Sequence, residues 1–436
     1  MRWSPTLPFI FALGCGSLFA QENPKPGGLT LAQAQELALR NNADLRIAQA
    51  QADAALAQLR AVHEFPNPVA GYSISKINTD NRSNGTATGH DFWSRSYDSI
   101  FSFSQLLELG KRGVRQASAS AGARSAQALR DDARRLLFQS SGQLYVAALE
   151  AQQEVRVLGA SAAALRKEAT IGTARLHAGD IAASDLGQIE IAAAQLELAA
   201  ASARTTARTA VMALEALLGH PAPQGETQLT DTLEGMAGLP LAGVDQPAGK
   251  RPDLEAAEAA LEKSEADLTL QRRANVPDLT VALQYEHQPP DQPNTIGLGL
   301  TFPLPLWNRN KGNILAAQAA RNQAQAQLDK MRTQAAADVA TARAAYAEAR
   351  ARADAYQHEL EPKSASIVQT VEYSFGKGGA SLVELLAAER NDNDIRIAAA
   401  RARADVASAR FALATALNRI DPLTGGSSPN PTPSSP

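Results

Sequence analysis

The sequence predicts a mainly helical protein with a small β part, formed by two copies of one strand–strand–long-helix unit. Residues 103–113 and 302–312 lie 199 positions apart, and each copy runs from a strand-like segment into a turn with a basic residue and Gly. A long Ala-rich helical pattern follows both copies, and the same offset places Gly179 on Gly378. Self-similarity at a fixed offset marks repeated structural units, so we interpret these agreements as an internal duplication.

The composition of the 436-residue chain suits long helices in close contact. Aromatic residues make up only 5% of the chain, and the long segments are dominated by Ala, Gln, Arg, Leu and Glu. The net charge of −3 is near neutral, and the basic residues lie on helices that also carry acids. This charge pattern argues against a nucleic-acid partner.

Residues 1–20 are predicted to be a signal peptide. Arg2 supplies the positive end, residues 7–19 supply the apolar core, and Ala20 is the expected cleavage position. A second interpretation is lipidation of Cys15, which follows Ala-Leu-Gly in a partial lipoprotein box. Cleavage after Ala20 would leave a mature chain without cysteine and therefore without disulfides.

The first repeat is predicted over residues 21–219 and begins with a helix. Apolar residues recur at helical spacing from Leu29 to Val62, and Thr30 is a candidate N-cap. Prolines in the segment 65–68 end this helix, because proline lacks the N–H that a helix needs. The elements that follow are strands at 70–75 and 100–107 around a polar loop at 76–98, then helices at 112–177 and 183–218.

The second repeat, residues 251–420, follows a connector at 220–250 that is rich in Pro, Gly and Thr. It repeats the order of the first. Its predicted elements are a helix at 251–273, strands at 279–286 and 295–302 around a tight polar loop at 287–294, and helices at 311–375 and 381–418. Residues 421–436 are rich in Pro, Ser and Gly and are predicted to be disordered.

The helix at 311–375 carries apolar residues at a spacing of three to four, which predicts a coiled-coil seam. Ala at many of these positions allows a neighbouring helix to approach closely. The seam comprises Leu328, Met331, Ala335, Val339, Ala342, Tyr346, Ala349, Ala353, Tyr356 and Leu360.

The four predicted strands indicate a membrane-embedded sheet. Each is about 9 to 11 residues long, which suits a tilted strand that crosses a bilayer. One face is apolar and the other carries Gly, Ser, Thr, Gln and Glu, as expected for a lipid side and a lumen side. Open sheet edges cannot face lipid, so several chains must contribute, and three would give a twelve-stranded barrel. A helix of about 65 residues would then reach roughly 95 Å from it.

The chain resembles the TolC-type outer-membrane efflux channels. The resemblance covers nearly everything after residue 28 and rests on Phe65-Pro-Asn-Pro68, the two strand-to-helix junctions and the two helix–turn–helix tips at 177–180 and 373–378. The junctions, Gln105-Leu-Leu-Glu-Leu-Gly-Lys-Arg112 and Leu304-Pro-Leu-Trp-Asn-Arg-Asn-Lys-Gly312, are most similar to the CzcC-like branch that is paired with heavy-metal pumps.

This resemblance implies a homotrimer whose twelve-stranded barrel lies in outer-membrane lipid and whose α-helical tunnel extends through the periplasm. It also implies docking to a periplasmic adapter and to an inner-membrane pump of the resistance-nodulation-division class. The channel would be a passive exit for heavy-metal cations or drugs, would catalyse no reaction and would need no cofactor. The alternative is a soluble periplasmic coiled-coil adapter, which would have no lipid-facing strands.

The helix tips are the candidate adapter contacts, because channels of this family meet their adapter there. The residues concerned are Gly179, Asp180, Gly376, Gly378 and Gly379. A simpler interpretation is that these glycines only stop helices, and both roles are compatible.

Glu384 and its duplicate Asp185 are the candidate pore gate. In this family, acidic side chains just after the second tip form a ring by three-fold symmetry. Such a ring selects for cations and raises the pKa of each carboxyl. The family's second acid is Ala387 here, so we expect a weaker or different gate. Alternatively, Ser381 and Glu384 form only a capping box.

Metal ligation by this chain is not expected. The six His residues are scattered without a spaced Cys, Asp or Glu partner, and the four Met residues are too sparse for a copper path. Trp93, Tyr97 and Trp307 are candidates for the membrane interface, with packing an equal interpretation for Trp307.

Overall fold

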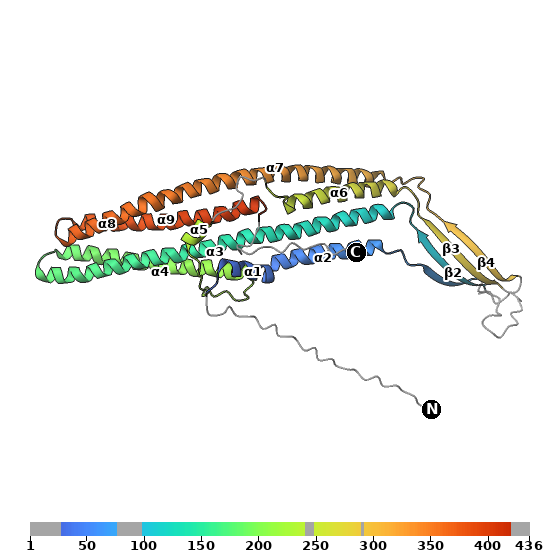
Figure 1. Cartoon of the computed structure of the whole chain (residues 1–436). Coiled ribbons are helices and arrows are strands. Elements are labelled where there is room, and N and C mark those ends of the chain that lie inside the picture. Colours follow the sequence, from blue (N-terminus) through green and yellow to red (C-terminus); the bar gives the residue numbers. More distant parts are fainter. Residues whose placement is uncertain (1–27, 76–97, 240–247, 289–291, 420–436) are drawn as a thin grey trace, which may run out of the picture.

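The computed structural model describes residues 28–75, 98–239, 248–288 and 292–419. The predictions for the signal peptide, Cys15, Trp93, Tyr97 and the C-terminal tail lie outside the described residues. The described part is elongated, with a β-sheet at one end and two helical hairpin tips at the other (Figure 1).

The first half follows the predicted order of elements. Its longest helix, α3, has 67 residues and a length of about 100 Å. The elements are α1 Leu31–Asn41, α2 Ala43–His63, β1 Val69–Ser75, β2 Asp98–Leu107, α3 Arg112–Ala178 and α4 Ala183–Leu217.

The second half repeats this order after a connector that contains one short helix. The connector helix was not predicted. The elements are α5 Leu233–Gly238 in the connector, then α6 Pro252–Arg273, β3 Leu279–Gln288, β4 Gln292–Thr301, α7 Lys311–Ala355, a π-helical segment at Tyr356–Leu360, α8 Glu361–Gly376 and α9 Leu382–Ala416.

Two predicted element boundaries were wrong. The helix expected over 29–62 is broken at Asn42, whose side-chain oxygen accepts from the Leu45 backbone N–H while its amide donates to the Leu217 carbonyl. This contact to the end of α4 favours a break that local periodicity does not show. The loop expected over 287–294 is shorter, because β3 continues to Gln288 and β4 begins at Gln292. The capping role of Thr30 is confirmed.

The four strands form one antiparallel sheet in the order β1-β2-β3-β4. Its register places large apolar side chains in one cross-strand row and small or polar ones in the next, because side chains alternate between faces. One such row is Tyr72, Phe101, Tyr285 and Ile296, and the neighbouring row on the other face is Gly71, Ser102, Gln284 and Gly297. The sheet therefore has one apolar and one polar face, as predicted.

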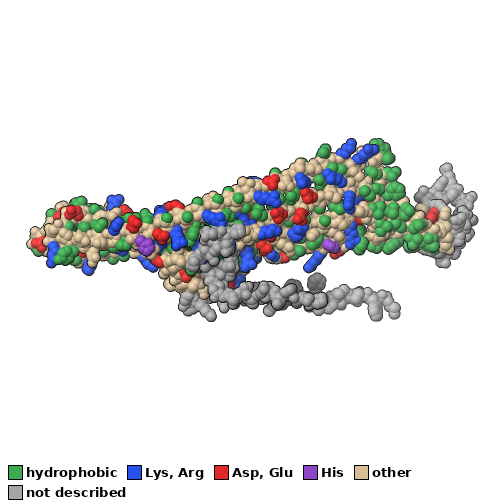
Figure 2. All heavy atoms as spheres, turned by 45° about the horizontal axis from the view of Figure 1, so that its top comes forward, with side chains coloured by type: hydrophobic (Ala, Val, Ile, Leu, Met, Phe, Trp, Pro, Cys, Tyr) green, Lys and Arg blue, Asp and Glu red, His purple; other side chains and the backbone are tan. Residues whose placement is uncertain are grey.

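The apolar face of the sheet is exposed on the single chain. Ile296 is 78% exposed and Leu298 is 74% exposed. Figure 2 shows this as a continuous hydrophobic surface at the sheet end, whereas charged side chains are scattered along the helices. None of the helices in the described ranges is long and apolar enough to cross a bilayer.

The helices pack around α3, which contacts both halves. The largest core cluster contains Tyr145, Leu149 and Phe411, which are buried. Phe411 of α9 lies so close to Gly142 of α3 that a Cβ there would be 2.6 Å from the ring. The Tyr145 hydroxyl lies 2.7 Å from the Leu29 carbonyl oxygen and holds the start of the described chain. This core fixes α9 of the second half against α3 of the first.

The start of the second half is held by a buried ion network. Arg251 donates to Asp253 at 2.6 Å and to Asp338 of α7 at 3.0 Å. Burial raises the pKa of the Asp253 carboxyl, but the hydrogen bonds and charge of Arg251, with the charge of Arg135, outweigh it and hold that pKa below its usual value. Arg135 of α3 also donates to the Thr415 carbonyl. The network therefore ties α3, α6, α7 and α9 together.

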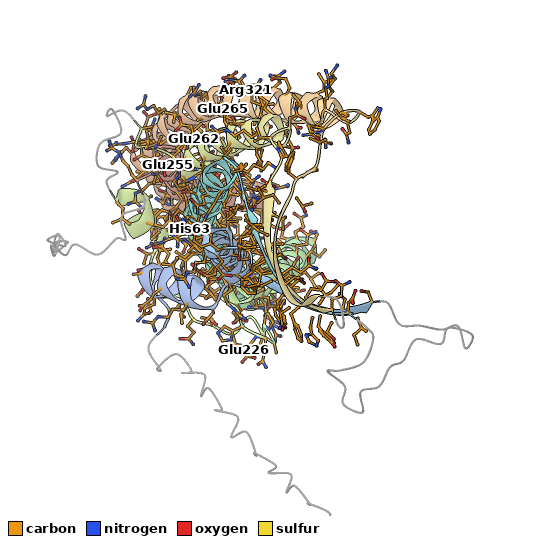
Figure 3. The ribbon with its side chains drawn as sticks, turned by 90° about the vertical axis from the view of Figure 1, so that its right-hand side faces the viewer. His63, Glu226, Glu255, Glu262, Glu265 and Arg321 are labelled. Carbon is orange, nitrogen blue, oxygen red and sulfur yellow. The ribbon has the colours of Figure 1, made fainter. Side chains whose placement is uncertain are left out.

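Farther along α6, ion pairs connect neighbouring helices at the surface. Glu255, Glu262 and Glu265 are labelled along α6 in Figure 3, with Arg321 of α7 beside them. Arg321 lies 3.1 Å from Glu265, and Glu262 pairs with Arg124 of α3. These pairs are exposed, so each contributes about 0–1 kcal/mol to stability.

The predicted seam of α7 is buried at every seventh residue up to the π-helical segment. Leu328, Ala335, Ala342 and Ala349 are buried, but Leu360 is 39% exposed. In the single chain, Leu360 therefore lies off the buried seam. A π-turn adds a residue to one helical turn and rotates the next turns of the helix off the seam. The cause is Pro362, which has no N–H and whose ring would clash with the carbonyl four residues earlier.

Candidate functional site

The first helix tip closes on Gly179, which has a φ of +83°. Its N–H donates to the Leu176 carbonyl at 3.0 Å, and the N–H of Asp180 donates to the Arg175 carbonyl at 2.8 Å. A left-handed glycine with these two bonds is a common way to end a helix. After the tip, Ala182 is the residue before α4, and its side chain makes no capping hydrogen bond.

The second tip repeats the same hydrogen bonds 199 residues later. Gly378 has a φ of +78°, and its N–H donates to the Phe375 carbonyl at 3.0 Å. The N–H of Gly379 donates to the Ser374 carbonyl at 2.8 Å. The left-handed conformation requires glycine at 179 and 378, whereas Gly376 is helical and has open space where a Cβ would lie.

The two tips pack against each other as one four-helix end (Figure 1). A cluster of Ala169, Ile189, Leu382 and Leu385 joins α3, α4 and α9, with Phe375 of α8 packed against it. The Arg175 guanidinium lies 5.3 Å from the Phe375 ring centroid. All five predicted contact residues therefore lie at one end of the molecule, where Gly179, Gly376 and Gly378 face open space.

Glu384 is held in a capping box at the start of α9. Its carboxylate accepts from the Ser381 N–H at 2.7 Å and from the Ser381 hydroxyl at 2.9 Å, while the Glu384 N–H donates back at 3.2 Å. The Ser381 N–H, and then its hydroxyl, hold the pKa of this exposed carboxyl below its usual value. The cap geometry of the second interpretation is thus present, and the gate role of Glu384 stays a prediction.

Asp185 occupies the equivalent place in α4 without such a cap. It is half-buried, and its N–H donates to the Ala182 carbonyl at 3.1 Å. Because Ala182 stands where Ser381 stands in the second half, the residue before α4 offers no hydroxyl to the Asp185 carboxylate. Within the described residues, no hydrogen bond joins Asp185 to Glu384. Its gate role also stays a prediction.

A carboxyl pair near the second tip was missed by the sequence reasoning. Burial is the largest cause that raises the pKa of Glu389. A hydrogen bond with Glu372 of α8 and the charges of Glu372 and Asp392 add to it, and together they bring the pKa to about 7 against the charge of Arg396. Asp392 is buried and pairs with Arg396 at 2.5 Å. Glu372 and Glu389 are 17 residues apart, so only the packing of α8 on α9 reveals the pair.

The strand-to-helix junctions differ in their contacts. In the first, Lys111 lies 2.9 Å from Asp278, Arg115 lies 2.6 Å from Glu108, and the Arg112 guanidinium stacks 3.4 Å from the Phe65 ring centroid. In the second, Asn310 begins α7 in the left-handed conformation and donates to the Gln271 carbonyl at 2.8 Å. Trp307 is 93% exposed, so the packing interpretation does not hold for the single chain.

Side chains that bind metals do not gather in this part of the chain. The described ranges contain no group of three or more His, Cys, Asp or Glu side chains that could hold a metal ion. The tips and junctions present exposed side chains, among them Trp307 and the Glu384 carboxylate.

Comparison with known proteins identifies the family. The chain matches the outer membrane efflux protein family over residues 34–220 and 244–419. It therefore belongs to the outer membrane efflux protein family. This places it in the outer membrane as an efflux channel component, and it confirms the predicted resemblance, localisation and channel function.

Individual relatives agree with this assignment. The chain is 29% identical over 307 residues to the cobalt-zinc-cadmium resistance protein CzcC of Cupriavidus metallidurans. The aligned residues make up 69% of this chain and 68% of CzcC. Among solved structures, CusC superimposes with a TM-score of 0.74 at 19% identity, covering 89% of this chain and 91% of CusC. The CmeC outer membrane channel of Campylobacter jejuni gives a TM-score of 0.74 at 19% identity and covers 96% of both chains. The predicted fold of duplicated strands and long helices is thereby confirmed.

These are channel folds, and family membership favours a channel over the soluble adapter that we considered as an alternative. Channels of this family work in tripartite systems with an adapter and a pump. The boundaries predicted for the two repeats stay predictions.

Proposed function

We propose that three copies of this chain form the passive exit duct of a tripartite efflux system that carries heavy-metal cations. Each copy would supply four strands to a twelve-stranded barrel and its long helices to a tunnel in the periplasm. The duct would dock to a periplasmic adapter and, through it, to an inner-membrane pump of the resistance-nodulation-division class. The pump supplies the energy, and the duct supplies an exit.

The sheet is the observation that carries this proposal. Strands β1 and β4 are its two edges, and the described chain offers no strand to pair with either. An unpaired edge leaves backbone groups without hydrogen bonds, which is unfavourable in lipid. Pairing β1 of one copy with β4 of the next satisfies both edges, and three copies close the ring. The apolar rows then face lipid and the polar rows face the lumen.

The length of the helices and the position of the tips support the proposed tunnel through the periplasm. Helix α3 is about 100 Å long, which exceeds the thickness of a bilayer more than twofold. Both tips lie at the far end from the sheet (Figure 1). Adapter contact is proposed at Gly179, Asp180, Gly376, Gly378 and Gly379, and the gate at Asp185 and Glu384.

The cargo assignment rests on the relative CzcC, whose name includes cobalt, zinc and cadmium resistance. A passive duct does not need to bind its cargo, so the absence of a metal group among the described residues does not bear on this choice. Drugs are the second candidate cargo, because a passive duct does not need to recognise what passes through it.

Membrane fractionation with semi-native electrophoresis tests the duct. We expect a heat-modifiable trimer in the outer membrane, and a soluble monomer would contradict the proposal. The cargo is tested in cells that keep a metal pump and its adapter but lack the outer-membrane component. Expression of this chain is expected to restore growth on cobalt, zinc or cadmium. Restored drug tolerance without metal tolerance would favour the second cargo.

A further inference from the structure

The segment that joins β4 to α7 exposes large apolar side chains. Leu304 is 63% exposed, Leu306 is 60% exposed and Trp307 is 93% exposed. They continue the exposed apolar row of β4 through Phe302, which is 50% exposed. Because this row is the proposed lipid-facing side of the sheet, the segment extends that surface to its helical end.

Two cations follow these apolar residues directly. Arg309 and Lys311 are exposed, and neither has an ion-pair partner among the residues that the structure describes. The equivalent junction of the first half is different, since Lys111 pairs with Asp278 and Arg115 pairs with Glu108. Figure 2 shows Lys and Arg side chains gathered where the hydrophobic sheet surface meets the helices.

The backbone of this segment is held in place. The Leu306 N–H donates to the Leu304 carbonyl at 2.9 Å, and the Asn310 N–H donates to the Asn308 side chain at 3.0 Å. The Asn310 amide is in turn bound to the Gln271 carbonyl of α6 at 2.8 Å. These hydrogen bonds therefore fix the backbone that carries the apolar residues, Trp307 and the two cations, in that order.

We propose that the segment Phe302–Lys311 binds anionic phospholipids of the periplasm-facing leaflet. Leu304 and Leu306 would contact the acyl chains, Trp307 would lie at the interface, and Arg309 and Lys311 would bind headgroup phosphates. Trp is favoured at membrane interfaces, and cations just outside the apolar layer attract anionic lipids. The inference rests on the proposed function, because it needs the sheet to lie in the membrane.

Lipid is the occupant that the surroundings favour. The segment is continuous with the lipid-facing row, and its charge complements a phosphate. A neighbouring copy of the chain is the competing occupant, and it would shield Trp307 from lipid.

The test uses fluorescence quenching of Trp307 by brominated lipids. The chain has three Trp residues, at positions 3, 93 and 307, so Trp93→Phe leaves Trp307 as the only one after the predicted signal peptide. This variant is reconstituted into vesicles that contain brominated phosphatidylglycerol or brominated phosphatidylcholine at equal mole fraction. We expect stronger quenching by phosphatidylglycerol, with a local preference of about fivefold per cation at low salt that declines at high salt.

A pair of charge variants locates the effect. R309Q/K311Q should abolish the preference for phosphatidylglycerol while leaving quenching by phosphatidylcholine. The matched control K330Q/R350Q removes two other exposed cations of α7, the nearer of them about 28 Å along the helix from Lys311, and should keep the preference. Equal quenching by the two lipids would overturn the inference, and absence of quenching by both would favour the neighbouring copy.

Conductance across the same vesicles separates this inference from the proposed function. A conducting channel without lipid preference overturns only the lipid site. A protein that inserts only as a monomer, seen by semi-native electrophoresis, speaks against the duct itself, and the lipid site falls with it. An inserted trimer that does not conduct is a duct with its gate closed. Equal conductance of the parent and both charge variants shows that the substitutions leave the fold intact.

Discussion

The two halves of the chain share one plan but stabilise equivalent places by different interactions. At the junctions, Glu108 of the first half becomes Trp307 in the second, and Lys111 becomes Asn310. Glu108 and Lys111 make ion pairs, whereas Trp307 is exposed and Asn310 binds the backbone of α6. The first junction is therefore satisfied within its own chain, and the second leaves a surface for another partner. Duplication preserved the backbone and released the side chains to diverge.

The largest expected loss of stability is at the start of α6, and we compare it with the loss at the start of α2. Arg251, the residue before α6, lies in a buried ion network without capping the helix, and Asn42 caps α2 with neutral hydrogen bonds. We expect Arg251→Met to destabilise the protein by about 3–5 kcal/mol, because it removes the main partner of the buried Asp253 carboxylate and leaves only the more distant Arg135. Asn42→Ala should cost about 1 kcal/mol. The temperature at which each variant dissociates on heating, compared with the parent protein, checks both losses of stability. Equal losses for the two variants would contradict this difference between the halves.

The next largest loss of stability is expected at the first strand-to-helix junction, and it should exceed the loss at the second junction. Asp278→Ala removes the partner of Lys111 and the acceptor of the Leu109 N–H, and both charged side chains are largely buried. We expect a loss of about 2 kcal/mol in local stability. Trp307→Ala in the second junction should change stability by less than about 0.5 kcal/mol, because the ring contacts little of its own chain. Hydrogen exchange at the first turns of α3 and α7 measures the two effects. A larger loss for Trp307→Ala would contradict the contrast.

A smaller effect is expected at the tips. Ser381→Ala removes the cap of α9 and should destabilise its first turn by about 1 kcal/mol. It also removes the hydroxyl donor to the Glu384 carboxylate but keeps the backbone N–H of residue 381, so the pKa of that carboxyl should rise only part of the way toward its usual value. The stability that depends on ionised Glu384 is lost as the pH falls through its lowered pKa, and this pH-dependent part should become smaller in the variant. Ala182→Ser is the reciprocal change and should stabilise the start of α4. Hydrogen exchange of the two first turns against pH is the measurement, and an unchanged pH profile in Ser381→Ala would count against the cap.

The smallest expected effect concerns pH at Glu389. Its folded pKa of about 7 exceeds the value of 4.5 for an unfolded chain, so the folded protein holds a proton that the unfolded chain releases between these values. The α8–α9 pair should thus be most stable below about pH 4.5 and should weaken as the pH rises through 7. Allowing for solvent screening, we expect about 1 kcal/mol. Glu389→Gln should flatten this dependence in hydrogen exchange, whereas Glu190→Gln on exposed α4 should not. A profile that rises with pH would refute the assignment.

Spacing in the sequence predicted the parts of the fold that depend on local pattern. The duplicated order, both left-handed glycines and the two faces of the sheet follow from period and turn chemistry. The break at Asn42 could not be predicted, because it depends on a contact with Leu217. The rotation of Leu360 off the seam was missed because Pro362 was not weighed as a cause of a π-turn. The Glu372–Glu389 pair needed the relative rotation of α8 and α9, which a single sequence does not specify.

Pairing between the edge strands of neighbouring copies is the central claim, and cysteine cross-linking tests it most directly. Both interpretations of Cys15, removal and lipidation, leave no free thiol in the mature chain. A cysteine at Tyr72 of β1 is combined in turn with a cysteine at Ile296, Leu298 or Leu300 on the same face of β4. Oxidation in outer membranes should give a covalently closed trimer for at least one of these pairs. Absence of intermolecular cross-links for all three pairs, with the chain inserted in the outer membrane, would contradict the account.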